Sequence, residues 1–573
     1  MIPAIYALTE APIAVLLDAD DTYIDSGIGL LLQDPDARLI YLVTLTPTRI
    51  SSEGSTPFPA PIASIPIASI EDDTPAAEEE SVIVYMANEA FTTEPDDAPP
   101  NQLFSPRLSQ PYLAESRISA PGSFGGSRGS VSVGVEAKIG DGEMYAALLS
   151  SSFRGQPLLI QLGGTLFEGT ADERVLTFAE FETLFNGFVG DFSWDTETLT
   201  LGGIDKSTFL DEPLQATAYA GTGGLEGGDD TKGLPKPLAF GRIFNAAPVL
   251  VDAANLIYQL NDGQIEQVDA VRDKGIALAF DADVTDITTA TPAAGEYATS
   301  LATGYIMLGS SPDGQVTVDF RGDNGGVGYK DVPAELVDKI LRDFAEYLDA
   351  DIDSAAIARV ALSSPYPAGY YTGTEAVNVS DVISAIMGSV DGWWRHLDVG
   401  LLTVGEYKAP ENGIIDTVIT DLNIVNGSFR KLQDDGPIYR VRVGYGKNWS
   451  PQNKDALAAA VTAANRTLYG EEYRFEEVNY STTKNIFPKA RDVALETLLA
   501  VQADAATLAS ALSVKYRGRR HVFSIATKGM AYRLSIGGIV NVQSGIIGID
   551  KNYFVFGIQE DAAAETTTIW LWG

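Results

Sequence analysis

Residues 182–194, ETLFNGFVGDFSW, and the following residues 196–201, TETLTL, decide the fold of this chain. Both stretches are rich in aromatic and β-branched residues, and Asp195 separates them, so they are predicted to form a β-hairpin. Residues 130–137 (SVSVGVEA) alternate in hydrophobicity, and residues 157–162 (PLLIQL) are almost continuously apolar. Together these patterns predict a barrel-like β-sheet over residues 112–202.

Outside this region the pattern changes along the chain. Residues 1–88 are predicted to be an acidic β region with a Pro-rich loop, and residues 251–325 a small β-rich domain. Apolar residues at helical spacing predict helices at 333–348, 354–360 and 380–390, with a hairpin after them, which is typical of a small α/β domain over residues 326–410. The last part, residues 411–573, is predicted to return to strands around one long helix at 490–516.

Length and composition exclude several classes of protein. With 573 residues the chain is long enough for several domains, and 45% hydrophobic and 20% charged residues are typical of a folded protein. The chain has no cysteine and only two histidines, His396 and His521, which excludes disulfides, thiolate metal sites and cysteine catalysis. No stretch of 18 apolar residues predicts a membrane span, and no basic amino-terminal region predicts a signal peptide. We therefore expect a soluble protein made in a cytoplasm.

The charge of the chain is strongly acidic and uneven. The formal net charge is −39, and residues 1–100 hold 18 acidic residues but only Arg38 and Arg49 as basic residues. A field of this sign repels phosphate backbones, so nucleic-acid binding is not expected as the main function. A saline habitat is an alternative origin of such a surface. The acidic run at residues 71–80, EDDTPAAEEE, is interpreted as a solvated loop rather than a binding tail.

Two motifs resemble catalytic or metal sites without meeting their requirements. Residues 125–129, GGSRG, match the nucleophile elbow of serine hydrolases, but a Gly-rich turn before a strand replaces the required strand-turn-helix. His396 lies among Trp393, Trp394 and Arg395 and is predicted to be a core residue at a strand edge. The Gly-rich residues 322–330 lack a phosphate cradle and are interpreted as an interdomain loop. No catalytic residue is predicted, and 78 acidic residues make paired carboxylates uninformative for glycoside hydrolysis.

Two clusters of aspartates have the residue type of a calcium site. Asp349, Asp351 and Asp353 have the spacing of a calcium loop, but Ser354 and Val360 occupy the positions that need Gly and Glu. A turn with Asp353 or Ser354 as helix N-cap is the preferred interpretation. A second cluster lies at Asp18, Asp20, Asp21 and Asp25, where weak calcium binding stays open. No metal ligand and no cofactor is predicted.

One region of the chain is basic. Residues 485–535 contain eight basic and three acidic residues, and the centre of the group is KYRGRR. In so acidic a protein, a basic patch predicts contact with the acidic surface of a neighbouring subunit, and its predicted interface residues are Lys515, Arg517, Arg519 and Arg520. The alternative is that these side chains cap the carboxyl end of a helix, where the dipole favours cations.

Several stretches resemble one family, the baseplate hub (tail tip) proteins of long-tailed phages and gene transfer agents, and in particular those of transposable siphophages. The stretches are 236–263 (KPLAFGRIFNAAPVLVDAANLIYQLNDG), 391–404 (DGWWRHLDVGLLTV), 439–449 (YRVRVGYGKNW), the helix ending at YRGRR, and the terminal TTTIWLWG. Residues 110–164 are similar to the first hub barrel. The similarity covers most of residues 85–573 but not the first 85.

The resemblance implies a fold and a function. It implies a β-rich α+β chain with two tail-tube-like β-barrels, the first over residues 89–250 and the second over residues 411–573, and small α/β inserts. It also implies a non-enzymatic homotrimer in the virion, assembled in the host cytoplasm, that contacts the distal tail protein, the tape-measure protein and the central fibre. DNA would pass through its lumen without specific binding. The alternatives are a hexameric distal tail protein and a tail-associated cell-wall hydrolase or adhesin.

Overall fold

The computed structural model describes residues 38–46, 48–49, 83–140, 148, 151–167, 173–529 and 534–573. The hairpin predicted at residues 182–201 is formed by β12 (Glu182–Trp194) and β13 (Thr198–Ile204), which pair antiparallel as predicted. The Pro-rich acidic loop and the aspartate cluster at Asp18–Asp25 lie outside the described residues.

The hairpin belongs to a first run of strands in a sheet of sixteen. The run has the order β3-β1-β10-β12-β13-β8. Its other members are β1 (Arg38–Leu45), β3 (Val84–Ala87), β8 (Ser130–Lys138) and β10 (Pro157–Leu166). In β8 exposed and buried residues alternate, and the inward side chains of the run join one apolar core that includes Val135, Leu158, Ile160, Phe185 and Leu201.

One segment bonds to both ends of this first run. Its first part, β5 (Leu103–Pro106), pairs with β3, and its second part, β6 (Leu108–Arg117), pairs with β8. Between them, the Arg107 N–H donates to Ala87 O at 2.9 Å, and Arg107 O accepts from Lys138 N–H at 2.8 Å. The strands therefore curl until the two ends of the run meet at one segment.

The sequence predicts a separate β region over residues 1–88. The described strands β1 and β3 instead belong to the first run. β1 pairs with β10 along its whole length, from Arg38 opposite Thr165 to Leu45 opposite Leu158, and it also pairs with β3. Five of its residues, 40 to 43 and 45, are buried in the core of the first run. The apolar side chains of β1 need a partner, and the strands from residue 157 onward supply it.

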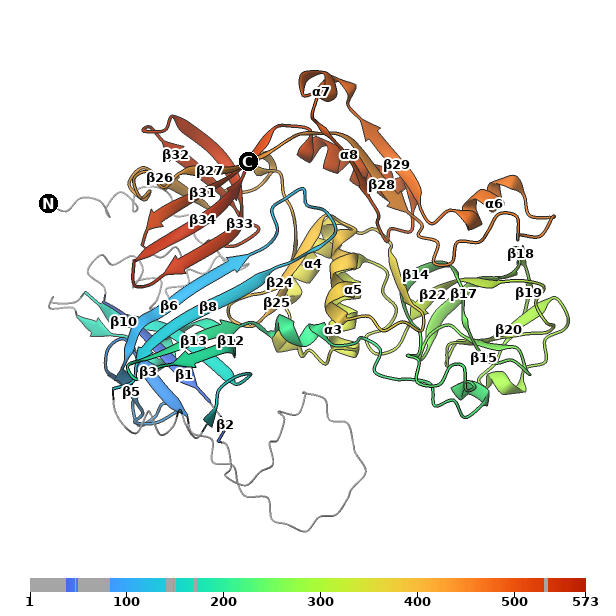
Figure 1. The fold of residues 1–573 in the computed structure, drawn as a ribbon, viewed down its shortest axis with the longest axis horizontal. Coiled ribbons are helices and arrows are strands. Elements are labelled where there is room, and N and C mark those ends of the chain that lie inside the picture. The colour runs from blue at the N-terminus through green and yellow to red at the C-terminus, as the bar shows by residue number, and fades with distance from the viewer. Residues whose placement is uncertain are drawn as a thin grey trace, which may run out of the picture.

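A second run of strands continues the same sheet. Its order is β32-β33-β34-β31, and β33 pairs antiparallel with β6, from Gly557 opposite Arg117 to Asp561 opposite Leu113. Figure 1 shows the two runs on the left, one below the other. The strands are β31 (Arg520–Lys528), β32 (Ile539–Ser544), β33 (Ile549–Asp561) and β34 (Thr566–Trp572).

One segment again bonds to both ends of the second run. β26 (Thr417–Thr420) pairs parallel with β32, and β27 (Arg430–Asp435) pairs antiparallel with β31. Between β26 and β27, Val425 N–H donates to Ala526 O and Lys528 N–H donates to Asn423 O, both at 2.8 Å. The second run thus repeats the arrangement of the first.

An α/β unit lies in the centre of the molecule (Figure 1). Its three helices begin at or next to the predicted residues, but the first ends at Asp343 rather than at residue 348. Its hairpin of β24 and β25 pairs through β24 with the short β7. Pro333 occupies the first turn of α3, and Lys339 is fully buried between Asp323 (2.7 Å) and Asp343 (2.8 Å). The elements are α3 (Pro333–Asp343), α4 (Ser354–Ser363), α5 (Val379–Gly388), β24 (Gly392–His396), β25 (Leu402–Glu406) and β7 (Ser127–Arg128).

A β-rich arm extends to the right of Figure 1. It contains two five-stranded sheets, of order β18-β17-β22-β14-β23 and β15-β16-β21-β20-β19. β14 and β23 extend it beyond the predicted range of 251–325. The strands are β14 (Leu238–Ala246), β15 (Val249–Asp252), β16 (Ile257–Gln259), β17 (Ile265–Asp273), β18 (Ile276–Ala277), β19 (Ala279–Asp283), β20 (Glu296–Ser300), β21 (Tyr305–Leu308), β22 (Val316–Asp323) and β23 (Gly369–Thr372).

The prediction of one long helix over residues 490–516 is wrong in its first half. β30 (Arg491–Leu495) pairs parallel with β28 (Ile438–Tyr445), and the helix α8 begins only at Gln502 and ends at Tyr516. Leu498 O and Leu499 O accept from Gly369 N–H and Gly446 N–H at 3.1 and 2.6 Å. These carbonyls are bonded across to other segments, so the buried leucines belong to a strand and a loop.

The remaining elements are short or peripheral. β29 (Arg474–Asn479) completes a three-stranded sheet with β28 and β30, next to α6 (Ala463–Gly470) and α7 (Ser481–Ile486). Four further two-residue strands are β2 (Thr48–Arg49), β4 (Phe91–Thr92), β9 (Ser151–Ser152) and β11 (Arg174–Val175). Among the described residues, no helix is both long and apolar enough to cross a membrane.

Candidate assembly interface

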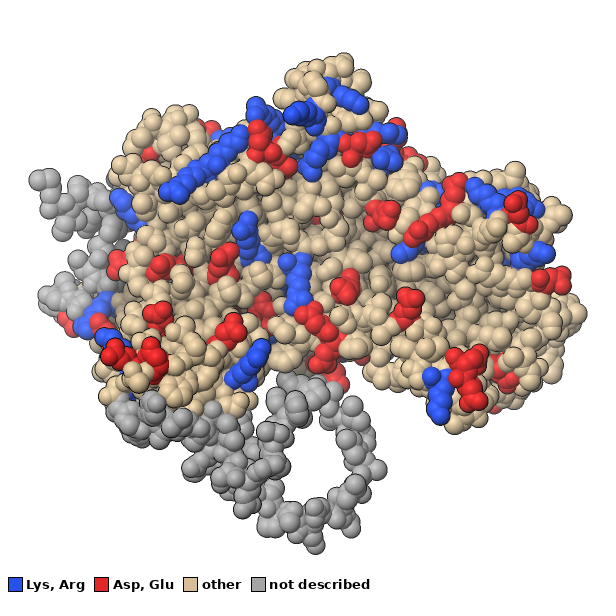
Figure 2. Space-filling view, in the orientation of Figure 1, with Lys and Arg blue, Asp and Glu red and all other residues tan. Residues whose placement is uncertain are grey.

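The basic patch predicted from the sequence lies where α8 ends and β31 begins. Figure 2 shows Lys and Arg side chains along the upper margin of the molecule, over α8, β28 and the second run of strands. Lys515 points inward, because its Nζ donates to Asp391 Oδ2 at 2.9 Å and to Tyr407 O at 2.5 Å. The Tyr516 hydroxyl donates to the same carboxylate oxygen at 2.9 Å. Lys515 therefore ties α8 to the α/β unit.

Of the other three predicted interface residues, Arg517 and Arg519 are exposed and Arg520 is largely buried. The guanidinium of Arg519 contacts Asp434 on β27, with Nε at 3.2 Å from Oδ1, and this contact lowers the pKa of Asp434. Arg520 donates to Glu411 at 3.0 Å and lies over the Trp572 ring. Arg517 lies over the Tyr480 ring, 5.4 Å from its centroid. Contacts within the chain thus engage all four residues, and their role toward a second subunit stays a prediction.

The hydrolase-like motif at residues 125–129 is a packing motif. Ser127 Oγ accepts from Ser119 N–H at 2.8 Å, and β7 leads into the strand β8 rather than a helix. Gly126 has φ +78°, and a Cβ at this position would lie 1.8 Å from Ser384 O. A Cβ on Gly129 would lie 2.6 Å from the Cβ of Arg395. Glycine is needed here because β7 is packed directly against α5 and β24.

His396 is a buried core residue, as predicted. Its Nε2 lies 2.9 Å from the Tyr347 hydroxyl, and burial lowers its pKa to about 3. An imidazole with this pKa stays neutral at physiological pH and packs against Tyr347. The described contacts of His396 and of Ser127 do not bring the two side chains together as a base and nucleophile.

The aspartates at 349, 351 and 353 each bind groups of the protein. Asp353 Oδ1 accepts from Ala356 N–H at 2.9 Å, which confirms the predicted N-cap of α4, and its Oδ2 accepts from the Thr403 hydroxyl. Asp351 accepts from Lys206 Nζ at 3.0 Å, and Asp349 pairs with Arg342. Within the described ranges, no three His, Asp or Glu residues are placed to share a metal ion.

Sequence reasoning missed a cluster of charged residues at the joint between the two runs of strands. Asp398, in the turn of the β24–β25 hairpin, accepts from the Ser116 hydroxyl of β6 at 2.7 Å, and its main-chain O accepts from Asn186 N–H of β12 at 2.7 Å. The buried Arg395 lies 3.9 Å from Asp398. On β33, burial and the charge of Asp398 raise the pKa of Glu560 to about 8. The β24–β25 hairpin therefore contacts both runs of strands at the joint between them.

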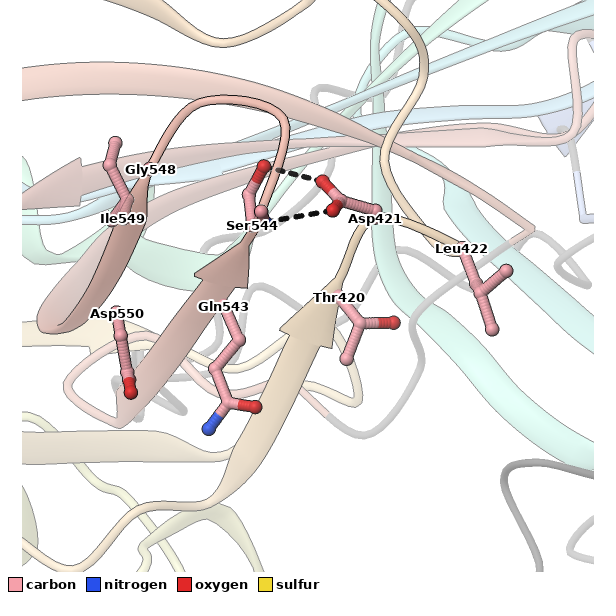
Figure 3. A pocket seen from close by; sticks show the side chains of 9 residues that line it. Thr420, Asp421, Leu422, Gln543, Ser544, Gly548, Ile549 and Asp550 are labelled. Atoms are coloured by element: carbon pink, nitrogen blue, oxygen red, sulfur yellow. Dashed lines mark hydrogen bonds between the residues drawn. The ribbon is translucent and has the colours of Figure 1, made fainter.

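A second feature absent from the sequence prediction is an exposed apolar patch beside β26. A hollow of about 580 Å³ lies between β26 and the β32–β33 turn. Figure 3 shows the Asp421 side chain pointing toward Ser544 at the start of this turn. Asp421 Oδ1 accepts from the Ser544 hydroxyl, and Oδ2 accepts from Gly545 N–H at 2.9 Å. This contact holds the turn, with its exposed Ile546, against the end of β26.

Comparisons with known proteins add the following findings. The sequence matches no protein-family model and no curated protein. Among solved structures, the 43 kDa tail protein of prophage MuSo2 from Shewanella oneidensis is 11% identical, with a TM-score of 0.35, over 82% of this chain and 94% of that chain. A tail protein from Neisseria meningitidis is 10% identical, with a TM-score of 0.33, over 81% and 92%. A chain of a native gene transfer agent virion is 13% identical, with a TM-score of 0.39, over 59% and 84%.

The chain is similar to phage tail and baseplate proteins. This is the class that its sequence resembles. Because these TM-scores are below 0.5 and the identities are 10–13%, they assign no role to any residue of this chain.

Proposed function

We propose that this chain is a structural component of a phage tail baseplate. In this proposal, three copies form a hub ring that continues the tail tube, anchors the central fibre and lines the DNA exit channel. The observation that carries the proposal is the sheet of sixteen strands, in which two runs of strands are joined at β6 and β33. In each run, one segment bonds to both ends.

Two strand runs in each subunit fit a threefold ring on a sixfold tube. Three copies would present six runs, so a trimer offers a pseudo-sixfold surface to a hexameric neighbour. Such matching needs the two runs to keep a fixed relative position. The pairing of β6 with β33 and the hairpin seated at Asp398 support this rigidity, because both hold the runs by hydrogen bonds rather than by a linker.

The charge of the chain suits a conduit for DNA. At a formal net charge of −39, the surface repels the phosphate backbone, so that DNA passes without adhering. In the assembled virion the ring would contact the distal tail protein, the tape-measure protein and the central fibre. Assembly would take place in the host cytoplasm. No step of this function requires catalysis.

The decisive experiment is an image reconstruction of purified tail particles in which this chain is searched for. Threefold density for the chain at the tail end supports the hub ring. Sixfold density would replace it by a distal tail protein, and absence of the chain from particles would remove the tail function altogether. A zymogram of the purified protein on peptidoglycan separates both from a cell-wall hydrolase, since clearing is expected only for the enzyme.

A further inference from the structure

The tip of the β-rich arm, defined as residues 276–286 and called the arm tip, carries an exposed apolar run at the edge of a sheet. Residues 276–280 (IALAF) are all apolar, and four of the five are exposed. Phe280 is 57% exposed, with its ring 5.6 Å from the Tyr297 ring. Among the described strands, β19 pairs only with β20, so its other edge has no strand partner. An open edge with an exposed apolar run is a surface that proteins normally cover.

The surroundings of the apolar run are acidic. Residues 275–320 contain six acidic residues and no Lys or Arg. Asp281, Asp283 and Asp286 follow the run and are exposed, and none of the three forms an ion pair with a described residue, since Asp283 and Asp286 accept from hydroxyl and main-chain N–H groups. The nearest basic residue in the sequence, Lys274, lies in the β17–β18 turn of the other five-stranded sheet. A complementary surface would be apolar with basic side chains around it.

A second projection of the chain is basic. Residues 478–491, called the α7 knob, run from the end of β29 through α7 to the start of β30 and contain no acidic residue. Of the three basic residues in the knob, only Arg491 has a described carboxylate partner, Asp435, at 3.1 Å. Lys484 and Lys489 are exposed and have no carboxylate partner among the described residues. Figure 2 shows Lys and Arg side chains on this projection, above α8.

The α7 knob also has an apolar residue at its surface. Ile486, at the end of α7, is 65% exposed and lies between Lys484 and Lys489 in the sequence. The two acidic residues that flank the knob, Glu477 and Asp492, pair with arginines of β28. The knob therefore presents an isoleucine with two unpaired lysines, whereas the arm tip presents a phenylalanine with three aspartates that lack a cation. One chain carries both halves of a complementary contact.

We propose that the arm tip of one copy docks against the α7 knob of a second copy of this chain. Phe280 would cover Ile486, and the aspartates of the arm tip would face Lys484 and Lys489. Figure 1 shows β18 and β19 at the right end of the molecule and α7 at its upper margin, so the two surfaces of one chain are far apart. The contact is therefore between copies.

The contact is compatible with a ring in which first and second runs alternate. Both surfaces lie on sheets other than the sheet of sixteen strands, so docking leaves the runs free to meet one another. Because the arm tip and the knob differ, the contact is head-to-tail, and each copy gives one arm tip and receives another. Closure at three copies rests on the proposed hub function, whereas the contact itself does not.

A membrane is the less suitable occupant of the arm tip. Anionic lipid headgroups repel its three aspartates. Flotation of the full chain with vesicles of phosphatidylcholine and phosphatidylglycerol separates the two cases, and we expect no flotation. Flotation that Phe280→Ser abolishes would overturn the docking of a second copy in favour of a lipid surface.

The absence of cysteine from the chain permits a direct cross-linking test. Ala279 and Asn485 are exposed and adjoin Phe280 and Ile486, so cysteines at these positions leave the apolar contact in place. Full-length Ala279→Cys and Asn485→Cys proteins, mixed at high concentration with a short bismaleimide, are expected to give a covalent dimer that contains one of each variant. The matched control mixes Ala279→Cys with Leu362→Cys, which is on α4 and 84% exposed, and is expected to stay monomeric. Equal cross-linking in both mixtures, or none in the first, would overturn the proposal.

Charge reversal on the knob tests the electrostatic part of the contact. Lys484→Glu/Lys489→Glu in the Asn485→Cys protein is expected to lower the yield of the mixed dimer about tenfold, because the aspartates of the arm tip then face like charges. The control Lys232→Glu/Arg359→Glu in the same protein changes the same number of charges on other elements and is expected to leave the yield unchanged. An unchanged yield in the knob variant, or an equal loss in the control, would overturn the proposal.

Variants of the arm tip complete the test. Asp281→Lys in the Ala279→Cys protein is expected to raise the yield with the Lys484→Glu/Lys489→Glu knob about threefold, since opposite charges face each other again. No recovery would overturn the pairing of these charges. Phe280→Ser in the Ala279→Cys protein is expected to lower the yield with the unchanged knob, and an unchanged yield would overturn the apolar contact.

The double variant Ala279→Cys/Asn485→Cys tests the direction of the contact and separates it from the proposed function. A head-to-tail ring is expected to give covalent trimers, whereas a two-fold contact stops at dimers and would overturn the one-way arrangement. Threefold density in particles together with no cross-link between arm tip and knob would reject the docking and leave the hub ring intact. Cross-linked trimers of a chain that is absent from tail particles would keep the docking and reject the hub.

Discussion

The two runs of strands share one arrangement but differ in how their cores are built. The first run has a core of its own, formed entirely by residues between 40 and 201. The second run has no separate core, because Phe554, Ile569 and Trp572 belong to one cluster with Trp394 of the α/β unit and Leu512 of α8. The core of the first run is therefore built without later elements, whereas the core of the second run is shared with elements that precede it in the sequence.

Truncation of one large core residue in each run tests whether the two cores differ in this way. Trp572→Ala and Phe185→Ala each remove a fully buried ring and are expected to cost about 3–5 kcal/mol of stability. Hydrogen exchange should show the loss in Phe185→Ala confined to the first run. In Trp572→Ala it should spread to α8 and the α/β unit, since Trp572 lies 5.6 Å from the Tyr516 ring. Equal spreading in both variants would show that the first core is not independent.

The joint between the runs is expected to respond to pH. Since burial raises the pKa of Glu560 in the folded state to about 8, the folded chain holds a proton that the unfolded chain releases above its ordinary pKa. Stability contributed by this group is therefore full at acidic pH and falls as the pH rises toward 8. Glu560→Gln should remove this slope and raise the free energy of unfolding at pH 8 by about 4 kcal/mol.

Denaturant unfolding between pH 5 and pH 8.5 measures this effect. Glu565→Gln, in the turn before β34, is the matched control and should keep the slope of the unmodified chain. An unchanged slope in Glu560→Gln would show that this carboxyl is ionised throughout that range.

The smallest effect on folding is expected at the basic patch. Arg517 contacts a ring and Arg519 contacts the exposed carboxylate of Asp434, and such surface contacts contribute little to stability. Arg517→Glu/Arg519→Glu should leave the unfolding midpoint unchanged and lower the yield of assembled particles. Unaltered particle yield would assign these side chains to the monomer alone.

Local patterns predicted the elements whose partners are close in the sequence. The hairpin at 182–204, the three helices of the α/β unit and the cap at Asp353 each depend on neighbouring residues, and the sequence therefore carries a signal for them. The leucines at 495, 498 and 499 misled the helix prediction because strand pairing with β28 overrode their spacing. The pairing of β1 with β10 and of β6 with β33 joins distant segments and leaves no periodicity to detect.

The site was predictable only in part for the same reason. The positions of the basic residues near 515–520 follow from composition, but their carboxylate partners come from elements folded against them, such as Asp391 and Asp434. The raised pKa of Glu560 depends on burial and then on the charge of Asp398, which lies on a hairpin far from β33 in the sequence.

The pairing of β6 with β33 also affects the order in which the sheet forms during synthesis. Gln110 and Asp561, which bond across it at 3.1 Å, are 451 positions apart. During synthesis, β6 leaves the ribosome with half of one edge uncovered and waits for nearly the whole chain before its partner exists. Only a copy synthesised through β33 can complete the sheet. A shortened copy therefore lacks the second run, and a ring that needs both runs discriminates against incomplete subunits.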